Sequence, residues 1–359
     1  MIVMSMGVKE SSYDTILLLL LPDLPMTRSA HPKATLLLRR ARLPALLITD
    51  LRNIRYVSGL DVSAGCILVT KQGFTLYTDA RYLEVAKAEA KKGITVCSLT
   101  LLADQLGKLG TVGIESENVT MARYTYWKKK YKNTKFVQTS GILEEFRRSK
   151  DPEELRCIRH ACSITRSVLR LVPHLLKSGV TEQEIAWQLE RECRKRGAEG
   201  MAFPSIVAFG EHTARPHHHP TQRRLSRGDL VQIDMGASYH GYCSDFSRVY
   251  FTVQPTVDQA RALRALKEAK VVVEKSLRVG VTNRSLDRCA REVLKKYGYD
   301  KEFSHALGHG LGLDIHEGVT LSRKAPRQIL KQCEVITIEP GLYFEGRWGM
   351  RIEDTIVVS

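Results

Sequence analysis

The sequence lacks the long apolar run that a membrane span requires. Its most apolar stretch near the start, Ile16–Leu21, is ended by Pro22 after six residues, whereas a membrane-spanning helix needs about 20. Acidic residues precede this stretch and Leu-Pro-Asp-Leu-Pro follows it, so the pattern of a signal peptide is missing as well. We expect residues 1–25 to be a loose leader, or a start assigned too early with Met26 as the true beginning, and we expect no membrane partner.

The sequence also lacks a CxxC pair, which argues against a zinc finger and against a dithiol redox motif. Without an export signal, the cysteines are expected to be free thiols of a reducing, cytoplasmic compartment. The eight of them are scattered along the chain: Cys66, Cys97, Cys157, Cys162, Cys193, Cys243, Cys289 and Cys333.

No run of five basic residues occurs, although 55 lysines and arginines against 39 acids give a net charge of +16. A basic balance of this size can attract nucleic acid or anionic membranes. Because the charges are spread along the chain, we attribute them to a solvated surface and do not expect nucleic acid as a partner.

The length of 359 residues, 43% of them hydrophobic, allows two domains with sizeable cores. Short β-rich segments bounded by turn residues predict an α/β domain over residues 26–142, with a helix at 80–92. No phosphate-binding glycine loop and no nucleophile motif occurs in this domain. Its predicted strands lie at 43–50, 65–71, 73–79, 94–99 and 111–116.

The second domain, residues 143–359, contains a diverged repeat, because residues 178–197 resemble residues 279–298 at an offset of 101. Thr181 and Glu184 predict a capping box at the start of the first repeated helix, and a glycine ends each helix. A β-rich segment with two acids follows each helix. A chance similarity remains the alternative interpretation.

Four carboxylates and one imidazole are the candidate metal ligands. Such a set suits two divalent cations that share bridging carboxylates, and a two-metal site activates water for hydrolysis. We therefore expect a binuclear metallohydrolase. The candidate ligands are Asp234, Asp245, His309, Glu339 and Glu353.

Two assumed hairpin registers bring these acids together. A two-residue turn at Tyr239–His240 would place Asp234 opposite Asp245, with Cβ atoms about 5 Å apart. A loop centred on Gly346 would place Glu339 opposite Glu353 in the same way. The alternative is that each acid is an exposed strand residue. That alternative is weak for Asp234 and Glu339, which lie among apolar residues, since a buried carboxylate needs a partner.

Histidines gather in two places. His305, His309 and His316 fall within twelve residues of a glycine-rich stretch, where we expect His309 on a turn that approaches other backbone closely. The run 217–219 contains three further histidines, of which we expect at most one to matter. Neutral imidazole can bind metal or move protons near neutral pH.

Six segments in order resemble the pita-bread metallopeptidases, in the branch of aminopeptidase P and prolidase. The resemblance is strong over 143–359 and less specific over 34–142, which is similar to a creatinase-like N-terminal domain. It implies an α+β chain with a C-terminal pita-bread (creatinase/aminopeptidase) fold and an N-terminal α/β creatinase-like domain. The segments are FPSIVAFGEHTARPHHHPT, LVQIDMGA, GYCSDFSR, SHALGHGLGLDIHE, ITIEPGLY and MRIEDT.

The resemblance also implies roles for individual residues. It makes Asp234 a ligand of one metal, Asp245 and Glu353 bridging carboxylates, and His309 and Glu339 ligands of the other metal. It implies two divalent ions, for which the carboxylate-rich ligand set favours Mn²⁺, with Co²⁺ and Zn²⁺ as alternatives. The remaining implied roles are substrate contact near the metals for His217, transition-state stabilisation and proton movement for His305 and His316, general base for Glu339, and the proline side of the pocket for Tyr343 and Arg351.

The expected activity is that of an Xaa-Pro aminopeptidase, which releases the residue before a proline in the second position. Prolidase, which cleaves Xaa-Pro dipeptides only, is the alternative and shares every expected metal ligand. Methionine aminopeptidase, a metal-free creatinase-like activity and a non-enzymatic binding protein are weaker alternatives, because the N-terminal domain and the complete ligand set argue against them. Peptides with an Xaa-Pro N-terminus are the expected partners, and a homodimer is left open.

Overall fold

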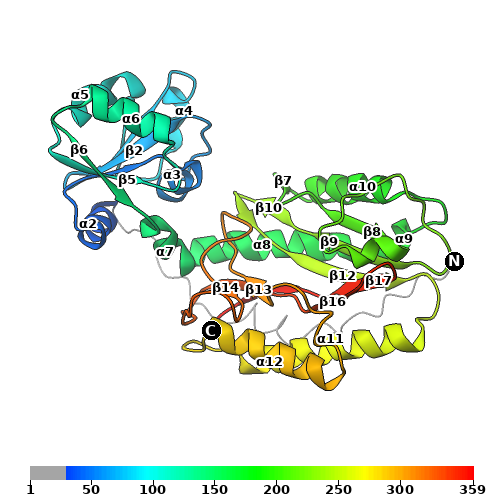
Figure 1. Ribbon diagram of the computed structural model, residues 1–359. Coiled ribbons are helices and arrows are strands. Elements are labelled where there is room, and N and C mark those ends of the chain that lie inside the picture. The colour runs from blue at the N-terminus through cyan, green and yellow to red at the C-terminus, as the bar shows by residue number, and fades with distance from the viewer. Residues whose placement is uncertain (1–29) are drawn as a thin grey trace. The chain divides into compact units, whose positions relative to one another are not determined.

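A computed structural model describes residues 30–359, so the prediction of a leader at 1–25 lies outside the described residues. The chain divides into two compact units with a boundary between Arg147 and Arg148, and each unit is described by itself (Figure 1). None of the described helices is long and apolar enough to cross a membrane.

The first unit, residues 30–147, is built on a six-stranded mixed sheet in the order β4-β3-β2-β1-β5-β6. β2 pairs antiparallel with β1 and β3, whereas the outer pairs β3–β4, β1–β5 and β5–β6 are parallel. All five predicted strands are confirmed, and β6 was missed. The strands are β1 (Leu46–Ile48), β2 (Gly65–Thr70), β3 (Gly73–Thr78), β4 (Ile94–Ser98), β5 (Thr111–Glu115) and β6 (Lys135–Thr139).

Helices cover both faces of this sheet, as the alternation of buried residues along its strands requires. Leu46 and Ile48 face a cluster that includes Ile54 of α3, whereas Leu47 faces a second cluster with Trp127 of α6. The helices are α2 (Ala30–Ala41), α3 (Leu51–Ser58), α4 (Leu83–Glu89), the 3₁₀ helix η1 (Leu99–Leu101), α5 (Leu102–Leu106), α6 (Met121–Lys130) and α7 (Ile142–Arg148).

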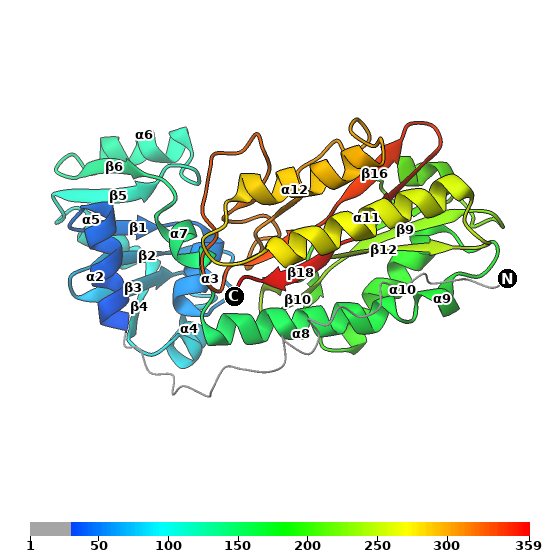
Figure 2. The ribbon, with the colours of Figure 1, turned by 90° about the horizontal axis from the view of Figure 1, so that it is seen from below.

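The second unit, residues 148–359, places strands between two layers of helices (Figures 1 and 2). Its helices are α8 (Pro152–Leu169), α9 (Val172–Leu175), α10 (Glu182–Lys195), η2 (Gly210–Ala214), α11 (Val257–Ser276) and α12 (Asn283–Lys296). Its strands are β7 (Gly200–Met201), β8 (Ile206–Phe209), β9 (Leu230–Met235), β10 (Ala237–Tyr239), β11 (Tyr242–Cys243), β12 (Phe246–Phe251), β13 (Gly308–His309), β14 (Thr320–Leu321), β15 (Val335–Ile338), β16 (Gly341–Phe344), β17 (Trp348–Arg351) and β18 (Asp354–Val357).

Each helical layer has its own hydrophobic cluster. α8 and α10 pack on one side of β9 through residues such as Ile158, Leu189 and Ile233. α11 and α12 pack on the other side through residues such as Leu266 and Leu294. Figure 2 shows the strands between these two pairs of helices. The two layers leave the strands that carry the candidate ligands in the interior of the unit.

The internal repeat predicted from the sequence is confirmed. α10 begins at Glu182 and α12 at Asn283, and both run for 14 residues, so the offset of 101 holds at both helix ends. The predicted capping box of α10 is present, and Gly197 and Gly298 follow the helices with φ of 92° and 84°. The resemblance of the two segments therefore reflects two equivalent helices.

The predicted register of the first hairpin is wrong. The turn lies at His240–Gly241, where φ is 47° and 79°, because a two-residue hairpin turn favours positive φ and glycine adopts it at little cost. Asp234 consequently pairs with Ser247. Asp245 lies two residues away along the same strand direction, so the two aspartates are diagonal neighbours on one face instead of direct partners.

The predicted register of the second hairpin is confirmed. Gly341 pairs with Arg351 in β16–β17, and Ile338 pairs with Asp354 in β15–β18. Both pairs belong to one continuous register around Gly346. Glu339 and Glu353 therefore stand opposite each other between the two ladders.

Glu154 on α8 is a buried acid whose ionisation makes the stability of the fold depend on pH. Burial raises the pKa of this carboxyl from 4.5 to about 7, although the Asp151 amide acts to lower it. The folded protein thus holds this proton more tightly than the unfolded chain, and the resulting stability is lost as pH rises from about 4.5 to 7.

The variant Glu154→Gln keeps hydrogen-bonding groups for Tyr242 and the Asp151 amide but cannot ionise. We therefore expect the Tm of metal-free protein to fall less between pH 5 and pH 8 in this variant than in wild type. The difference between the two falls in Tm should be about 5 °C. The exposed neighbour Glu153, changed to Gln, is the control. Equal pH slopes for Glu154→Gln and wild type would contradict the assignment.

Candidate metal centre and active site

The candidate site residues line one cavity of about 570 Å³ in the second unit. Asp234 lies on β9 and His309 on β13, whereas the other three candidate ligands directly flank strands: Asp245 precedes β12, Glu339 follows β15 and Glu353 precedes β18. All five line the cavity. Candidate residues on this cavity are Asp234, Asp245, His309, Glu339, Glu353, His217, His305, His316 and Arg351. Tyr343 is not part of the lining, but it is hydrogen-bonded to His305 and to Arg351.

His309 is oriented by its own backbone. Its Nδ1 donates to the Gly310 carbonyl at 3.1 Å, which leaves the lone pair of Nε2 free, as in most metal-binding histidines. Nε2 lies 3.6 Å from an oxygen of Asp245 and 3.6 Å from an oxygen of Glu339. These gaps are too long for hydrogen bonds, but they suit ligand atoms that each lie about 2 Å from a shared ion.

The carboxylates have unused oxygens. Asp234 Oδ1, Asp245 Oδ1 and Glu353 Oε1 are buried without a hydrogen-bond partner. Their other oxygens meet Arg351, His309 and the Ser247 hydroxyl. Orphaned buried carboxylate oxygens need compensation, and divalent cations supply it. The residues present therefore fit a metal centre.

The crowding of acids shows in their protonation. Burial raises the pKa of Asp245 well above its ordinary value, and the charges of Glu353, Asp234 and Glu339 raise it further. Burial also raises the pKa of Glu353, again with help from neighbouring carboxylates. The pKa of Glu339 rises to about 8 through burial, although Arg351 opposes the shift. Four acids this close require more positive charge than Arg351 provides.

Three of the cavity histidines, His305, His309 and His316, have lowered pKa values. Burial lowers the pKa of His305 to about 4, with a further contribution from the charge of Arg351. Burial and the neighbouring His316 lower the pKa of His309 to about 4. Burial also lowers the pKa of His316. Near pH 7 each ring can therefore offer one donor nitrogen and one acceptor nitrogen.

His305 and His316 differ in what their nitrogens already do. His305 Nδ1 donates to the Ala306 carbonyl, so its Nε2 accepts from the Tyr343 hydroxyl at 3.2 Å. His316 lies edge-on to His309 with ring centroids 4.2 Å apart. Among residues 30–359, no protein group hydrogen-bonds to either ring nitrogen of His316. It is the freer donor of the two.

Neighbouring backbone and hydroxyl groups hydrogen-bond to the candidate ligands, and the sequence pattern did not reveal these contacts. The Thr337 hydroxyl accepts from the His309 amide at 3.1 Å, and the Thr355 hydroxyl bonds both the amide and the carbonyl of Asp245. His309 lies on β13 instead of the predicted turn. The expected close approach is present, since a Cβ on Gly308 would lie 2.1 Å from the Thr337 carbonyl oxygen.

The three consecutive histidines separate into two kinds. His217 and His219 are exposed on the cavity, whereas His218 is buried and hydrogen-bonds to Glu182. Only His217 had been expected to act near the substrate, and the connection of His218 to Glu182 was missed. Glu182 had given no signal beyond its place at the start of a predicted helix.

The fold and the carboxylate-histidine cavity define a metal-dependent hydrolase of the pita-bread type. Residues 156–359 match the family described as "Metallopeptidase family M24", and residues 32–149 match the family described as "Creatinase/Prolidase N-terminal domain". The chain belongs to metallopeptidase family M24, whose members use two divalent metal ions.

Relatives that are named for a peptidase activity match nearly the whole chain. The chain is 33% identical to an Xaa-Pro dipeptidase of Pyrococcus horikoshii, over 88% of this chain and 90% of the relative. It is similar in structure to an Xaa-Pro dipeptidase from Bacillus anthracis, with a TM-score of 0.87, 31% identity and coverage of 92% and 95%. It is also similar to an X-Pro aminopeptidase from Thermotoga maritima, with a TM-score of 0.82, 33% identity and coverage of 89% and 95%.

Proposed function

We propose that this chain is an Xaa-Pro dipeptidase, a prolidase that hydrolyses dipeptides with proline in the second position. The observation that carries the proposal is the cavity with four carboxylates and one oriented imidazole, in a chain that matches dipeptidases of that name along most of its length. The sequence motifs alone favour the aminopeptidase, whereas the similarity to Xaa-Pro dipeptidases favours the prolidase.

In this proposal Asp234, Asp245, His309, Glu339 and Glu353 would hold two divalent ions, and Asp245 and Glu353 would be the carboxylates that both ions share. Bound ions supply a water that is activated for attack on a carbonyl near neutral pH. The ligand set is dominated by carboxylate oxygen, which suits harder ions, so Mn²⁺ is the expected metal ahead of Co²⁺ and Zn²⁺. The eight free cysteines support a reducing, cytoplasmic location.

In this proposal, side chains of the protein transfer the proton, stabilise the carbonyl oxygen and contact the substrate. Glu339 takes up the proton of the attacking water at a carboxylate oxygen and returns it to the proline nitrogen as the C–N bond breaks. His316 donates an N–H to the oxygen of the carbonyl under attack, because its ring nitrogens have no other protein partner. A row of hydrogen-bonded side chains lies beside the candidate ligands and consists of His305, Tyr343 and Arg351. We assign these three side chains to the proline side of the substrate. His217, on the segment between η2 and β9, contacts the substrate.

One observation favours the aminopeptidase as the second candidate. A dipeptide presents a free carboxylate after proline, which a cation should recognise. Among the described residues, Arg351 is the single arginine or lysine on the cavity lining, and it is already bonded to Asp234 and Tyr343. A longer peptide has no carboxylate at that position. Of the three consecutive histidines, the exposed His217 and His219 are left to meet one, because His218 is buried and bonded to Glu182.

A comparison of three substrates decides between the candidates. With Mn²⁺-loaded protein, we expect kcat/KM for Ala-Pro to exceed that for Ala-Pro-Ala and for Ala-Pro amide by at least about tenfold, since one lost charge-assisted hydrogen bond costs about 1.5–3 kcal/mol. Ala-Ala is the control for proline specificity. Equal or faster cleavage of Ala-Pro-Ala would replace the dipeptidase by the aminopeptidase.

A further inference from the structure

One buried carboxylate holds the segment that carries His217. Glu182 is the first residue of α10 and is fully buried. The segment from 209 to 221 leaves β8, forms η2 and then passes His217 on the cavity wall. This segment is largely irregular, so its position depends on side-chain contacts.

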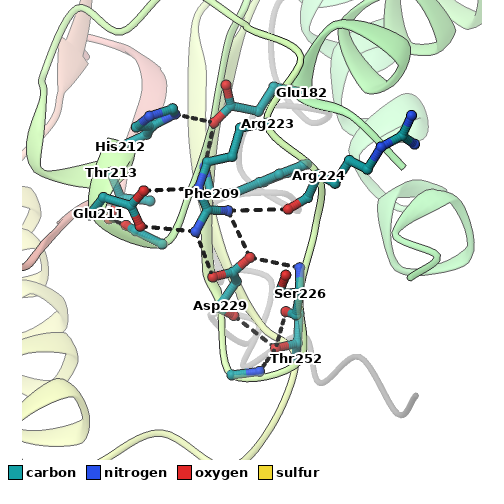
Figure 3. A network of polar contacts seen from close by, with 12 residues as sticks. Glu182, Phe209, Glu211, His212, Thr213, Arg223, Arg224, Ser226, Asp229 and Thr252 are labelled. Atoms are coloured by element: carbon teal, nitrogen blue, oxygen red, sulfur yellow. Dashed lines mark hydrogen bonds and ion pairs between the residues drawn. The ribbon is translucent and has the colours of Figure 1, made fainter. Parts of the chain in front are cut away.

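Glu182 receives five hydrogen bonds, all from this segment. Oε1 accepts from the Phe209 amide at 2.9 Å and from His212 Nδ1 at 2.9 Å (Figure 3). Oε2 accepts from His218 Nε2 at 2.9 Å and from the Thr221 amide and hydroxyl at 2.9 and 2.6 Å. The donors lie on both sides of His217, and one of them is its immediate neighbour.

The group Glu182, His212 and His218 has the composition of a metal site, but its hydrogen bonds argue against one. Each carboxylate oxygen accepts a backbone N–H, which cannot leave without moving the chain. Burial by itself raises the pKa of Glu182, yet the donors His218, Thr221, Phe209 and His212 outweigh burial and lower the pKa to about 2. The carboxylate is therefore ionised and already saturated with donors.

An ion pair at the exposed surface of the same segment serves as a comparison, because such exposed pairs contribute little to stability. Arg223 places its guanidinium between Glu211 and Asp229, with contacts of 2.9 and 2.8 Å (Figure 3). Glu211 is exposed, whereas Glu182 is buried. Glu182 and Glu211 thus both take part in polar contacts of this segment. Of the two, only Glu182 bonds to the residue next to His217.

The repeat provides an independent parallel. Asn283 occupies the position in α12 that Glu182 occupies in α10, and it is also fully buried. Its side chain donates to the carbonyls of Thr320 and Pro326 and accepts from the Gln328 amide, at 2.8, 3.0 and 3.0 Å. Those residues follow His316 closely in sequence. Both halves therefore use the first residue of the repeated helix to hold a segment adjoining a cavity histidine.

We infer that Glu182 is a positioning residue of the active site, which acts through His218 and Thr221 to hold His217 toward the substrate. The inference rests on the proposed function, because that function gives His217 its contact with substrate. Glu182 itself touches neither substrate nor metal. Its effect on turnover should therefore depend on the presence of the His217 imidazole.

A double-mutant cycle tests this dependence. Glu182→Gln preserves size but places an amide nitrogen against groups that donate. We expect it to lower kcat/KM by at least about tenfold, because small misplacements near a reacting centre can cost up to about 10²-fold. Two bound metals should remain. In a His217→Ala background, Glu182→Gln should change kcat/KM by less than about twofold, since residues that act as one unit are not additive.

Thr221→Val is the milder variant if Glu182→Gln folds poorly, because it removes one hydroxyl donor and keeps the backbone amide. Its smaller loss should likewise vanish in the His217→Ala background. Glu211→Gln is the matched control on the same segment and should leave kcat/KM within about twofold of wild type. Equal losses of kcat/KM with and without His217 would overturn the inference. So would a third metal ion that is bound by the wild type and absent from Glu182→Gln, since it would make Glu182 a metal ligand.

The two proposals fail in different ways. Wild-type protein that does not cleave Xaa-Pro dipeptides would refute the proposed function. The positioning role would be refuted separately by additive losses on whichever peptide the wild type does cleave, or by a His217→Ala variant that cleaves it at the wild-type rate.

Discussion

Replacing Asp245 with alanine should abolish peptide hydrolysis while leaving the fold intact. We expect kcat/KM to fall by more than about 10³-fold, beyond the loss for a single oxyanion donor, because a shared carboxylate would hold both ions. The Asp245 side chain makes little other contribution, since its Oδ1 has no hydrogen-bond partner. Metal content by elemental analysis should drop by at least one ion per chain, and far-ultraviolet circular dichroism should be unchanged.

Asp287→Ala is the matched control for this variant. Asp287 is also a buried carboxylate of the second unit, but it bonds to Arg291 and to the Arg323 amide and is not among the residues that line the cavity. Its loss should lower Tm and leave two metals and the turnover per folded molecule unchanged. An Asp245→Ala protein with two metals and wild-type turnover would show that Asp245 is not a shared ligand.

Replacing His316 with alanine should lower kcat and kcat/KM together by about 10²–10³-fold, the scale for one oxyanion donor. His316 is exposed on the cavity beside His309, and its ring nitrogens have no protein hydrogen bond within residues 30–359. Because it is not a proposed ligand, the variant should keep two metals. That result separates it from Asp245→Ala.

The opposing interpretation is that His316 only shapes its loop. In that case Tm would fall and turnover per folded molecule would hardly change. His240→Asn is the control, since His240 is exposed at a hairpin turn outside the cavity and asparagine tolerates its positive φ of 47°. Near-wild-type kcat for His316→Ala, measured with metal content and Tm on one preparation, would remove it from the mechanism.

The parts of the structure that follow local rules could be predicted from the sequence. Capping and glycine signals located α10 and α12, and alternation located the strands of the first unit. The gathering of the candidate ligands on one cavity could be predicted because acids among apolar residues are costly unless they are paired. The register of Glu339 and Glu353 was predicted because the loop around Gly346 has an odd length.

Long-range polar contacts could not be predicted in the same way. The first hairpin was misplaced because two adjacent dipeptides could form the turn, and positive φ at Gly241 decided between them. Glu182 could not be distinguished from other helix-start acids, since its donors lie 27 to 39 residues away along the chain. That Arg351 is the single arginine or lysine on the described cavity lining likewise depends on which residues meet there once the chain is folded.

The most direct test of a two-metal peptidase is metal-dependent activity with a counted stoichiometry. Protein stripped by a chelator, and verified as metal-free by elemental analysis, should not cleave Ala-Pro. Titration with Mn²⁺ should restore hydrolysis and reach a plateau at two ions per chain, with the five candidate ligands intact. Full hydrolysis of Ala-Pro by the verified metal-free protein would contradict the account.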